Sequence, residues 1–158
     1  MQTTTNLRPS VASGLGRVGA VSPAGPLLAA RHFISKLAFE TDPSDLAADL
    51  EAGVAGLVVV DTRQPEAFAT SHLPGAVNLP HNMIDEQSTA GLDPEALYVT
   101  YCWGPACNAS TRGAANLASL GYRVKELTGG LEAWQAEGYP VEGTTDVTSL
   151  PTEGSCAC

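Results

Sequence analysis

No apolar stretch in this 158-residue sequence is long enough to span a membrane, and no secretory leader is recognisable at its start. The longest apolar run, residues 55–60, surrounds one glycine, whereas a membrane-spanning helix needs about 20 apolar residues. A secretory leader would need a basic start and a longer apolar stretch than residues 26–30 provide. We therefore expect a cytoplasmic protein that has no membrane partner.

Basic residues are scarce as well. Eight lysines and arginines stand against 17 aspartates and glutamates, which gives a formal net charge of -9. A surface of this sign repels phosphate backbones and anionic lipid head groups, so we expect no nucleic-acid partner. An anionic substrate would need local hydrogen-bond donors to overcome the same field, whereas a protein donor or a neutral thiol compound would not.

Cysteine is too sparse for a small secreted domain that depends on disulfides, because the chain contains only four. In a cytoplasmic protein such usage indicates reactive thiols or a metal site. The spacings between the four are poor for structural zinc, which favours four thiolates arranged around it as a tetrahedron. We therefore expect no metal and no cofactor. The four residues are Cys102, Cys107, Cys156 and Cys158.

Composition divides the chain into three parts. Residues 1–25 are rich in Thr, Ser, Gly and Pro and predict a flexible N-terminal extension, and residues 143–158 predict a mobile tail that ends in Cys-x-Cys. Residues 26–142 form the predicted domain. It starts with an added helix over about 26–38, because Pro26 suits a first helical turn and apolar residues follow at helical spacing. The predicted apolar face consists of Leu27, Ala30, Phe33, Ile34 and Leu37.

Strands and helices alternate along the rest of the domain. Short apolar or β-branched runs predict four strands, at residues 56–61, 76–79, 97–101 and 124–127. Capping residues and helical periodicity predict the helices between and around them, at residues 43–53, 65–70, 108–120 and 130–137. This alternation predicts an α/β fold with a mostly parallel sheet and helices on both of its faces.

Cys102 directly follows the predicted strand 97–101, at the end of the sheet where α/β proteins bind ligands. Backbone N–H groups of the loop and the N-terminus of the next helix favour negative charge there. We therefore expect the pKa of the Cys102 thiol to lie below the value of about 8.5 for free cysteine, and we expect Cys102 to be a nucleophile. A buried structural cysteine is the alternative. The loop consists of Trp103, Gly104, Pro105, Ala106, Cys107 and Asn108.

Four segments, taken in order, resemble the rhodanese family. Residues 58–68 resemble the family's Asp-x-Arg-x-x-x-Glu segment. Residues 71–80 resemble its Gly-His-Ile-Pro-Gly-Ala signature. Residues 101–102 match the strand end with the catalytic cysteine, and residues 127–134 resemble its Gly-Gly-x-x-x-Trp segment. The resemblance covers roughly residues 40–142 and implies a five-stranded, mostly parallel sheet. It also implies a sulfurtransferase that holds sulfane sulfur on Cys102 as a persulfide and passes it to a thiol or protein acceptor.

The loop departs from the common pattern of the family. Cys107 stands where an arginine often stands, and Asn108 stands where the related tyrosine phosphatases need an arginine to grip phosphate. Phosphatase activity is therefore not expected, and thiosulfate is disfavoured relative to a persulfide donor. Arg63 and Arg112 are the remaining candidates for binding an anion, although Asp61 and Arg63 more often form a pair that ties loops together.

Two other functions remain open at this point. The first is an inactive rhodanese-fold module that serves only in interactions. The second is a thiol-redox or arsenate-reducing protein that uses Cys102 together with Cys107. Cys107, Cys156 and Cys158 are candidate secondary thiols, with unconstrained surface thiols as the alternative for the last two.

Overall fold

A computed structural model of the chain describes residues 16–144 and divides the chain into two units, Met1–Lys36 and Leu37–Cys158. Most of the expected extension and nearly all of the expected tail, with Cys156 and Cys158, lie outside the described residues. In the part that the structure describes, no helix is both long and apolar enough to cross a membrane.

The described part of the first unit contains a short 3-10 helix, η1 (Val18–Ala20), and most of helix α1 (Pro26–Phe39). Helix α1 lies where the sequence predicts a helix over residues 26–38. None of its residues is buried, and the apolar face predicted for it is exposed. The apolar periodicity therefore predicts the helix correctly, but the apolar face of this helix is not part of a buried core.

The second unit is built on a sheet of five parallel strands in the order β1-β5-β4-β2-β3. The strands β2 (Leu57–Asp61) and β4 (Leu97–Tyr101) pair along their whole lengths, and β5 (Arg123–Leu127) lies on the other side of β4. The edge strands β1 (Glu40–Thr41) and β3 (Val77–Asn78) have two residues each. The predicted α/β fold with a parallel sheet is confirmed.

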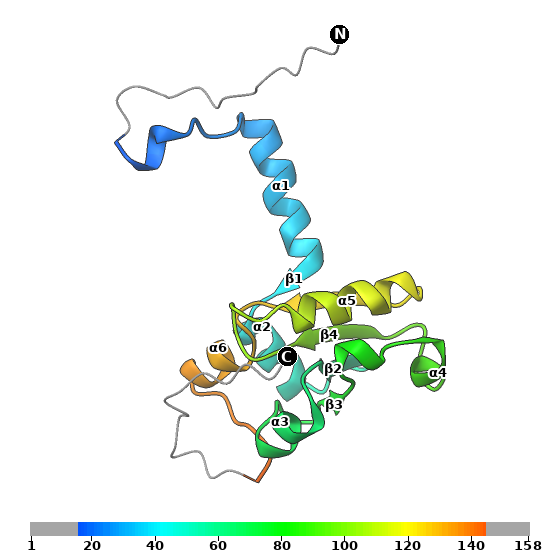
Figure 1. Cartoon of the computed structure of the whole chain (residues 1–158). Coiled ribbons are helices and arrows are strands. Elements are labelled where there is room, and N and C mark those ends of the chain that lie inside the picture. Colours follow the sequence, from blue (N-terminus) through cyan, green and yellow to red (C-terminus); the bar gives the residue numbers. More distant parts are fainter. Residues whose placement is uncertain (1–15, 145–158) are drawn as a thin grey trace. The chain divides into compact units, whose positions relative to one another are not determined.

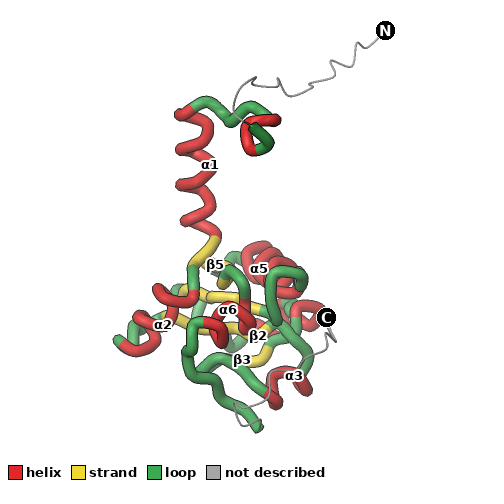
Figure 2. The backbone as a smooth tube through the Cα atoms, turned by 90° about the vertical axis from the view of Figure 1, so that its left-hand side faces the viewer, coloured by secondary structure: helices red, strands yellow, loops and turns green. Residues whose placement is uncertain are grey.

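Helices cover both faces of this sheet, as Figures 1 and 2 show. Because successive side chains of a strand point to opposite faces, neighbouring residues of β2 enter two different cores. Val59 packs with residues of α2 (Pro43–Glu51) and α6 (Gly130–Ala136). Val60 packs in the core that includes Leu117 of α5 (Ala109–Ser119). Burial on both faces explains the continuous β-branched run in the sequence.

The connection after β2 contains three short helices. Helix α3 (Pro65–Thr70) has the predicted bounds, whereas η2 (His81–Met83) and α4 (Glu86–Thr89) are not predicted. Each of these two is about one turn long, which is too short for an apolar period to show. A capping box between Asp85 and Ser88 starts α4.

Strand β1 has no sequence signal of its own, because Glu40 and Thr41 form no apolar run. These two residues form a strand because they pair with β5, and in this pairing Glu40 lies opposite Glu126. The strand is followed at once by α2, whose start is set by the Asp42 side chain accepting a hydrogen bond of 2.9 Å from the backbone N–H of Asp45. This short edge brings Glu40 to the end of the sheet where Cys102 lies.

Candidate active site

Cys102 lies at the carboxyl end of β4 and is 2% exposed. The last hydrogen bonds along β4 come from Thr62, which lies just after the end of β2. The N–H and the hydroxyl of Thr62, just after β2, both donate to the carbonyl of Tyr101, at 3.0 and 2.8 Å. The chain then turns away from the sheet and enters α5 after Asn108. The predicted position of Cys102, between a strand end and a helix start, is confirmed.

Helix α6 holds the loop from the other side. The carbonyl of Cys102 accepts a 3.0 Å hydrogen bond from Leu131, and the carbonyl of Trp103 accepts one of 2.9 Å from Glu132. Gly130 makes this close approach possible: its φ is +57°, and an added Cβ would lie 2.5 Å from the carbonyl oxygen of Cys102. The glycine pair before Trp134 in the sequence therefore serves to anchor the loop of the nucleophile.

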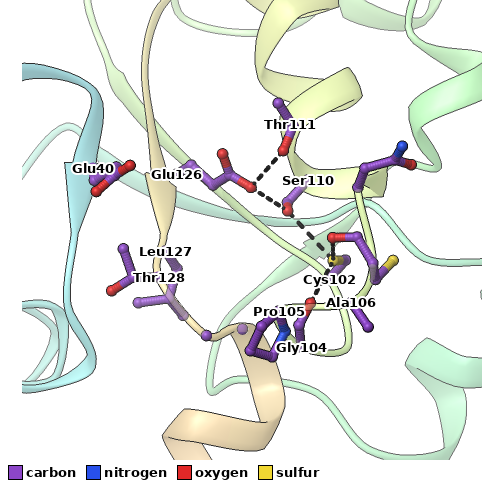
Figure 3. Close-up of a pocket in the computed structure, with 14 residues that line it drawn as sticks. Glu40, Cys102, Gly104, Pro105, Ala106, Ser110, Thr111, Glu126, Leu127 and Thr128 are labelled. Carbon is purple, nitrogen blue, oxygen red and sulfur yellow. Dashed lines mark hydrogen bonds between the residues drawn. The ribbon is translucent and has the colours of Figure 1, made fainter. Parts of the chain in front are cut away.

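Cys102 lines a cavity of about 280 Å³ at the end of the sheet (Figure 3). All of the predicted loop residues line it except Trp103, which packs beside Cys102 outside the cavity lining. The remaining lining residues, which the sequence did not indicate, come from β1, α5, β5, the turn before α6 and the first residue of α6. They are Glu40, Ser110, Thr111, Glu126, Leu127, Thr128, Gly129 and Gly130.

The sulfur of Cys102 has one hydroxyl and two carbonyls around it. The Ser110 hydroxyl lies 3.3 Å from the sulfur, within reach to donate to it, and the carbonyls of Cys107 and Gly104 lie within reach of the thiol hydrogen, at 3.2 and 3.8 Å. Cys107 is buried as well, and the two cysteines form no disulfide. The sulfur is therefore held between hydrogen-bond donors of Ser110, which favour the thiolate, and acceptors, which favour the thiol.

Burial raises the pKa of the Cys102 thiol, and the hydrogen-bond donors of Ser110 oppose this rise without cancelling it. The expectation of a lowered pKa from the loop and the helix dipole is therefore wrong for this structure. The physical reason is that removing the sulfur from water disfavours the charged form more than the donors favour it, while Cys107 also raises the pKa. In the structure described, the resting form of Cys102 is a thiol.

Glu126 is the unexpected member of the site. Its carboxylate accepts hydrogen bonds from the hydroxyls of Ser110 and Thr111, at 2.6 and 2.9 Å. Figure 3 shows Glu126 and Cys102 on either side of Ser110. One signal was available in the sequence: Glu126 is next to the end of a predicted strand, and the carboxyl ends of neighbouring parallel strands meet at one edge. Ser110 gave no such signal.

Arg63 and Asp61 form a buried ion pair beside the site. The guanidinium of Arg63 makes three contacts with the carboxylate of Asp61, of 3.0, 3.2 and 2.6 Å, and donates to the carbonyl of Ser71. Tyr101 donates to the same carboxylate at 2.6 Å, and burial followed by the charge of Asp61 raises the pKa of Tyr101. Arg63 also lies 5.7 Å from the ring centroids of Tyr101 and Trp103. It does not line the cavity.

Arg112, the other predicted cation, is exposed on α5 and is also absent from the cavity lining. The structure thus brings together Cys102 and Cys107 and leaves both arginines outside. Among residues 16–144, no three His, Cys, Asp or Glu side chains lie close enough to hold a metal ion.

Comparison with known proteins agrees with this geometry. Residues 42–137 match the model of the rhodanese-like domain. The chain belongs to the rhodanese-like family. It is 39% identical over 106 residues to a thiosulfate sulfurtransferase, GlpE, of Pseudomonas putida, an alignment that covers 66% of this chain and 91% of that protein.

Two solved structures are similar to this chain as well. The BH2092 protein of Bacillus halodurans is 46% identical and superposes with a TM-score of 0.74, over 80% of this chain and 96% of that one. A rhodanese-like domain of Anabaena, from the Alr3790 protein, is 27% identical with a TM-score of 0.61, over 73% of this chain and 86% of that one. The fold described above is therefore the rhodanese fold.

Proposed function

We propose that this rhodanese-like protein is a sulfurtransferase that carries sulfane sulfur on Cys102 as a persulfide. The observation that carries the proposal is the position of Cys102: its thiol lies at the carboxyl end of a central parallel strand, in a cavity, with the Ser110 hydroxyl directed at the sulfur. A purely structural cysteine would need neither a cavity nor a donor.

In the first half-reaction the thiolate of Cys102 attacks the sulfane sulfur of the donor. A new S–S bond forms on Cys102, and the old S–S bond breaks, so that the donor leaves with the electron pair. With thiosulfate the leaving group is sulfite, and with an organic persulfide it is a thiolate. Helix α5 supports this step because the hydroxyl of its Ser110 can donate to the sulfur while the sulfur carries charge.

In the second half-reaction an acceptor nucleophile attacks the terminal sulfur of the persulfide. The S–S bond to Cys102 breaks, the Cys102 thiolate is regenerated, and a thiol acceptor leaves as a persulfide. No net oxidation or reduction is needed, so the cycle requires no cofactor. The similarity to the GlpE relative, a thiosulfate sulfurtransferase, supports this class of reaction.

Cys107 gives a specific reason to keep one alternative. Its carbonyl lies 3.2 Å from the sulfur of Cys102, and both residues are buried in the same small cluster. A second thiol so near can resolve an oxidised nucleophile as a disulfide. The competing function is therefore thiol-redox chemistry that uses this pair.

Mass spectrometry separates these functions. The reduced protein is incubated with thiosulfate or with glutathione persulfide, and peptides that contain Cys102 are mapped. We expect the gain of one sulfur atom on Cys102, its absence in Cys102→Ser, and its release when a thiol acceptor is added. An internal Cys102–Cys107 disulfide without sulfur gain would support the redox function, and no modification at all would support an interaction module.

A further inference from the structure

The charged side chains that line the cavity are all acidic. Among the described residues, the charged residues that line the cavity are Glu40 and Glu126. No described lysine, arginine or histidine lines it. A site built for a dianion would be expected to present a cation or a fork of N–H donors to it. The charged side chains that line the cavity around Cys102 therefore have the wrong sign for thiosulfate.

Glu126 is held in place toward the nucleophile. Its carboxylate accepts from Ser110 and Thr111, and Ser110 in turn reaches the sulfur of Cys102, so a single hydroxyl separates the carboxylate from the reacting atom. Both partners of Glu126 are neutral hydroxyls. In the described part of the chain no salt bridge joins Glu126 to a cation. The negative charge therefore acts on whatever enters the cavity.

Glu40 lies beside Glu126 because the register of β1 and β5 places the two residues opposite each other. Like charges opposite one another in a sheet repel, and both of these carboxylates line the same cavity. In the view of Figure 3, Glu40, Glu126, Ser110 and Cys102 follow one another across the cavity. A positive group bound near the two carboxylates would thus place its neighbouring atoms toward the sulfur.

The two arginines near the loop do not reverse this field. Arg63 is neutralised by Asp61 in the interior, and Arg112 is exposed on α5 outside the lining. Neither arginine therefore places its charge in the cavity lining, whereas Glu126 does.

We propose that Glu126, assisted by Glu40, makes this site select thiols that carry a positive group next to the sulfur, such as aminothiols, and discriminate against anionic sulfur compounds. The inference rests on the proposed persulfide on Cys102 and names the class of its acceptor. The aminothiol thiolate attacks the terminal sulfur, the bond to Cys102 breaks, and the product is an aminothiol persulfide. The ammonium group stays unchanged and is attracted by the two carboxylates.

The test uses three small thiols of similar size and different charge. Cys102 is first loaded with cysteamine persulfide, whose ammonium group the two carboxylates do not repel, the excess donor is removed by gel filtration, and the protein persulfide is verified by mass spectrometry. Its second-order decay is then measured with cysteamine, 2-mercaptoethanol and 3-mercaptopropionate. Because the thiols differ in intrinsic reactivity, the measured quantity is the ratio of cysteamine to mercaptopropionate rates, compared between variants.

In Glu126→Gln the amide oxygen can still accept from Ser110, so the change removes charge and little else. We expect the cysteamine preference to fall by on the order of ten- to a hundredfold relative to the unchanged protein. The matched control is Glu95→Gln, which removes an exposed charge just before β4, at the end of the strand remote from Cys102. It should leave the ratio unchanged.

Ionic strength supplies a second readout. Added salt should slow the reaction with cysteamine and speed the reaction with mercaptopropionate, and both effects should weaken in Glu126→Gln. A cysteamine preference that is the same in Glu126→Gln as in the unchanged protein would overturn the inference. Failure to load Cys102 with sulfur at all would instead overturn the proposed function, so the two failures are distinguished at the loading step.

Discussion

The hydroxyl of Ser110 lies 3.3 Å from the sulfur of Cys102, and it is the side-chain donor that the described structure directs at the nucleophile. The same hydroxyl lies 2.6 Å from a carboxylate oxygen of Glu126. Since a hydroxyl has one hydrogen, it serves the carboxylate when Cys102 is a thiol and can turn to the sulfur when the thiolate forms.

Replacing this hydroxyl should slow the first half-reaction. We expect Ser110→Ala to lower the rate of persulfide formation at neutral pH by about tenfold, the lower end of what a hydrogen bond to a charged group contributes, because the proton is shared with Glu126. The measurement is single-turnover sulfur transfer from glutathione persulfide. Thr111→Ala is the matched control, since Thr111 donates to Glu126 and not to the sulfur. Equal losses in both variants would contradict a direct role for Ser110.

The raised pKa of Cys102 predicts how the reaction depends on pH. Only the thiolate attacks sulfur, so a pKa above the ordinary value for a cysteine leaves a small thiolate fraction at neutral pH. The rate of persulfide formation should rise about tenfold for each pH unit and level off only above that ordinary value. The thiolate fraction can be followed by ultraviolet absorbance, as the difference between the unchanged protein and Cys102→Ser. A midpoint below that of free cysteine would contradict this account.

Cys107 should be an accessory thiol. We predict that Cys107→Ser keeps at least part of the sulfurtransfer activity, because the contact that the structure shows to Cys102 comes from the backbone carbonyl of Cys107, which serine retains. The assay is transfer from glutathione persulfide to a thiol acceptor, with Cys102→Ser as the inactive reference. If Cys107→Ser were as inactive as that reference, Cys107 would belong to the transfer step itself.

The Asp61–Arg63 pair should stabilise the fold rather than bind substrate. In Asp61→Asn the buried guanidinium loses its counter-charge, so the free energy of unfolding should fall by about 3 kcal/mol or more, measured with urea. Glu142→Gln serves as the control: this glutamate is largely exposed, 3.5 Å from His72, and its loss should cost less than about 1 kcal/mol. An Asp61→Asn protein as stable as the unchanged one, yet inactive, would assign the pair to substrate binding instead.

Much of this protein follows from its sequence, because the relevant signals are local. The β-branched run before Asp61 and the run before Cys102 each predict a strand, and the observed β2 and β4 agree with them to within one residue at their ends. The position of the nucleophile follows from the same signals, since a residue that directly follows a central parallel strand must lie at the ligand-binding end of the sheet.

Only the tertiary structure decided the electrostatics of the site. Glu40 and Glu126 are far apart in the chain and meet through the pairing of β1 with β5, which no local pattern in β1 announces. The pKa of Cys102 likewise depends on how completely the folded chain removes its sulfur from water, so loop donors and a helix dipole alone predicted the wrong direction. Periodicity along one segment predicts elements and their ends, whereas charge and burial at a site depend on which distant segments pack there.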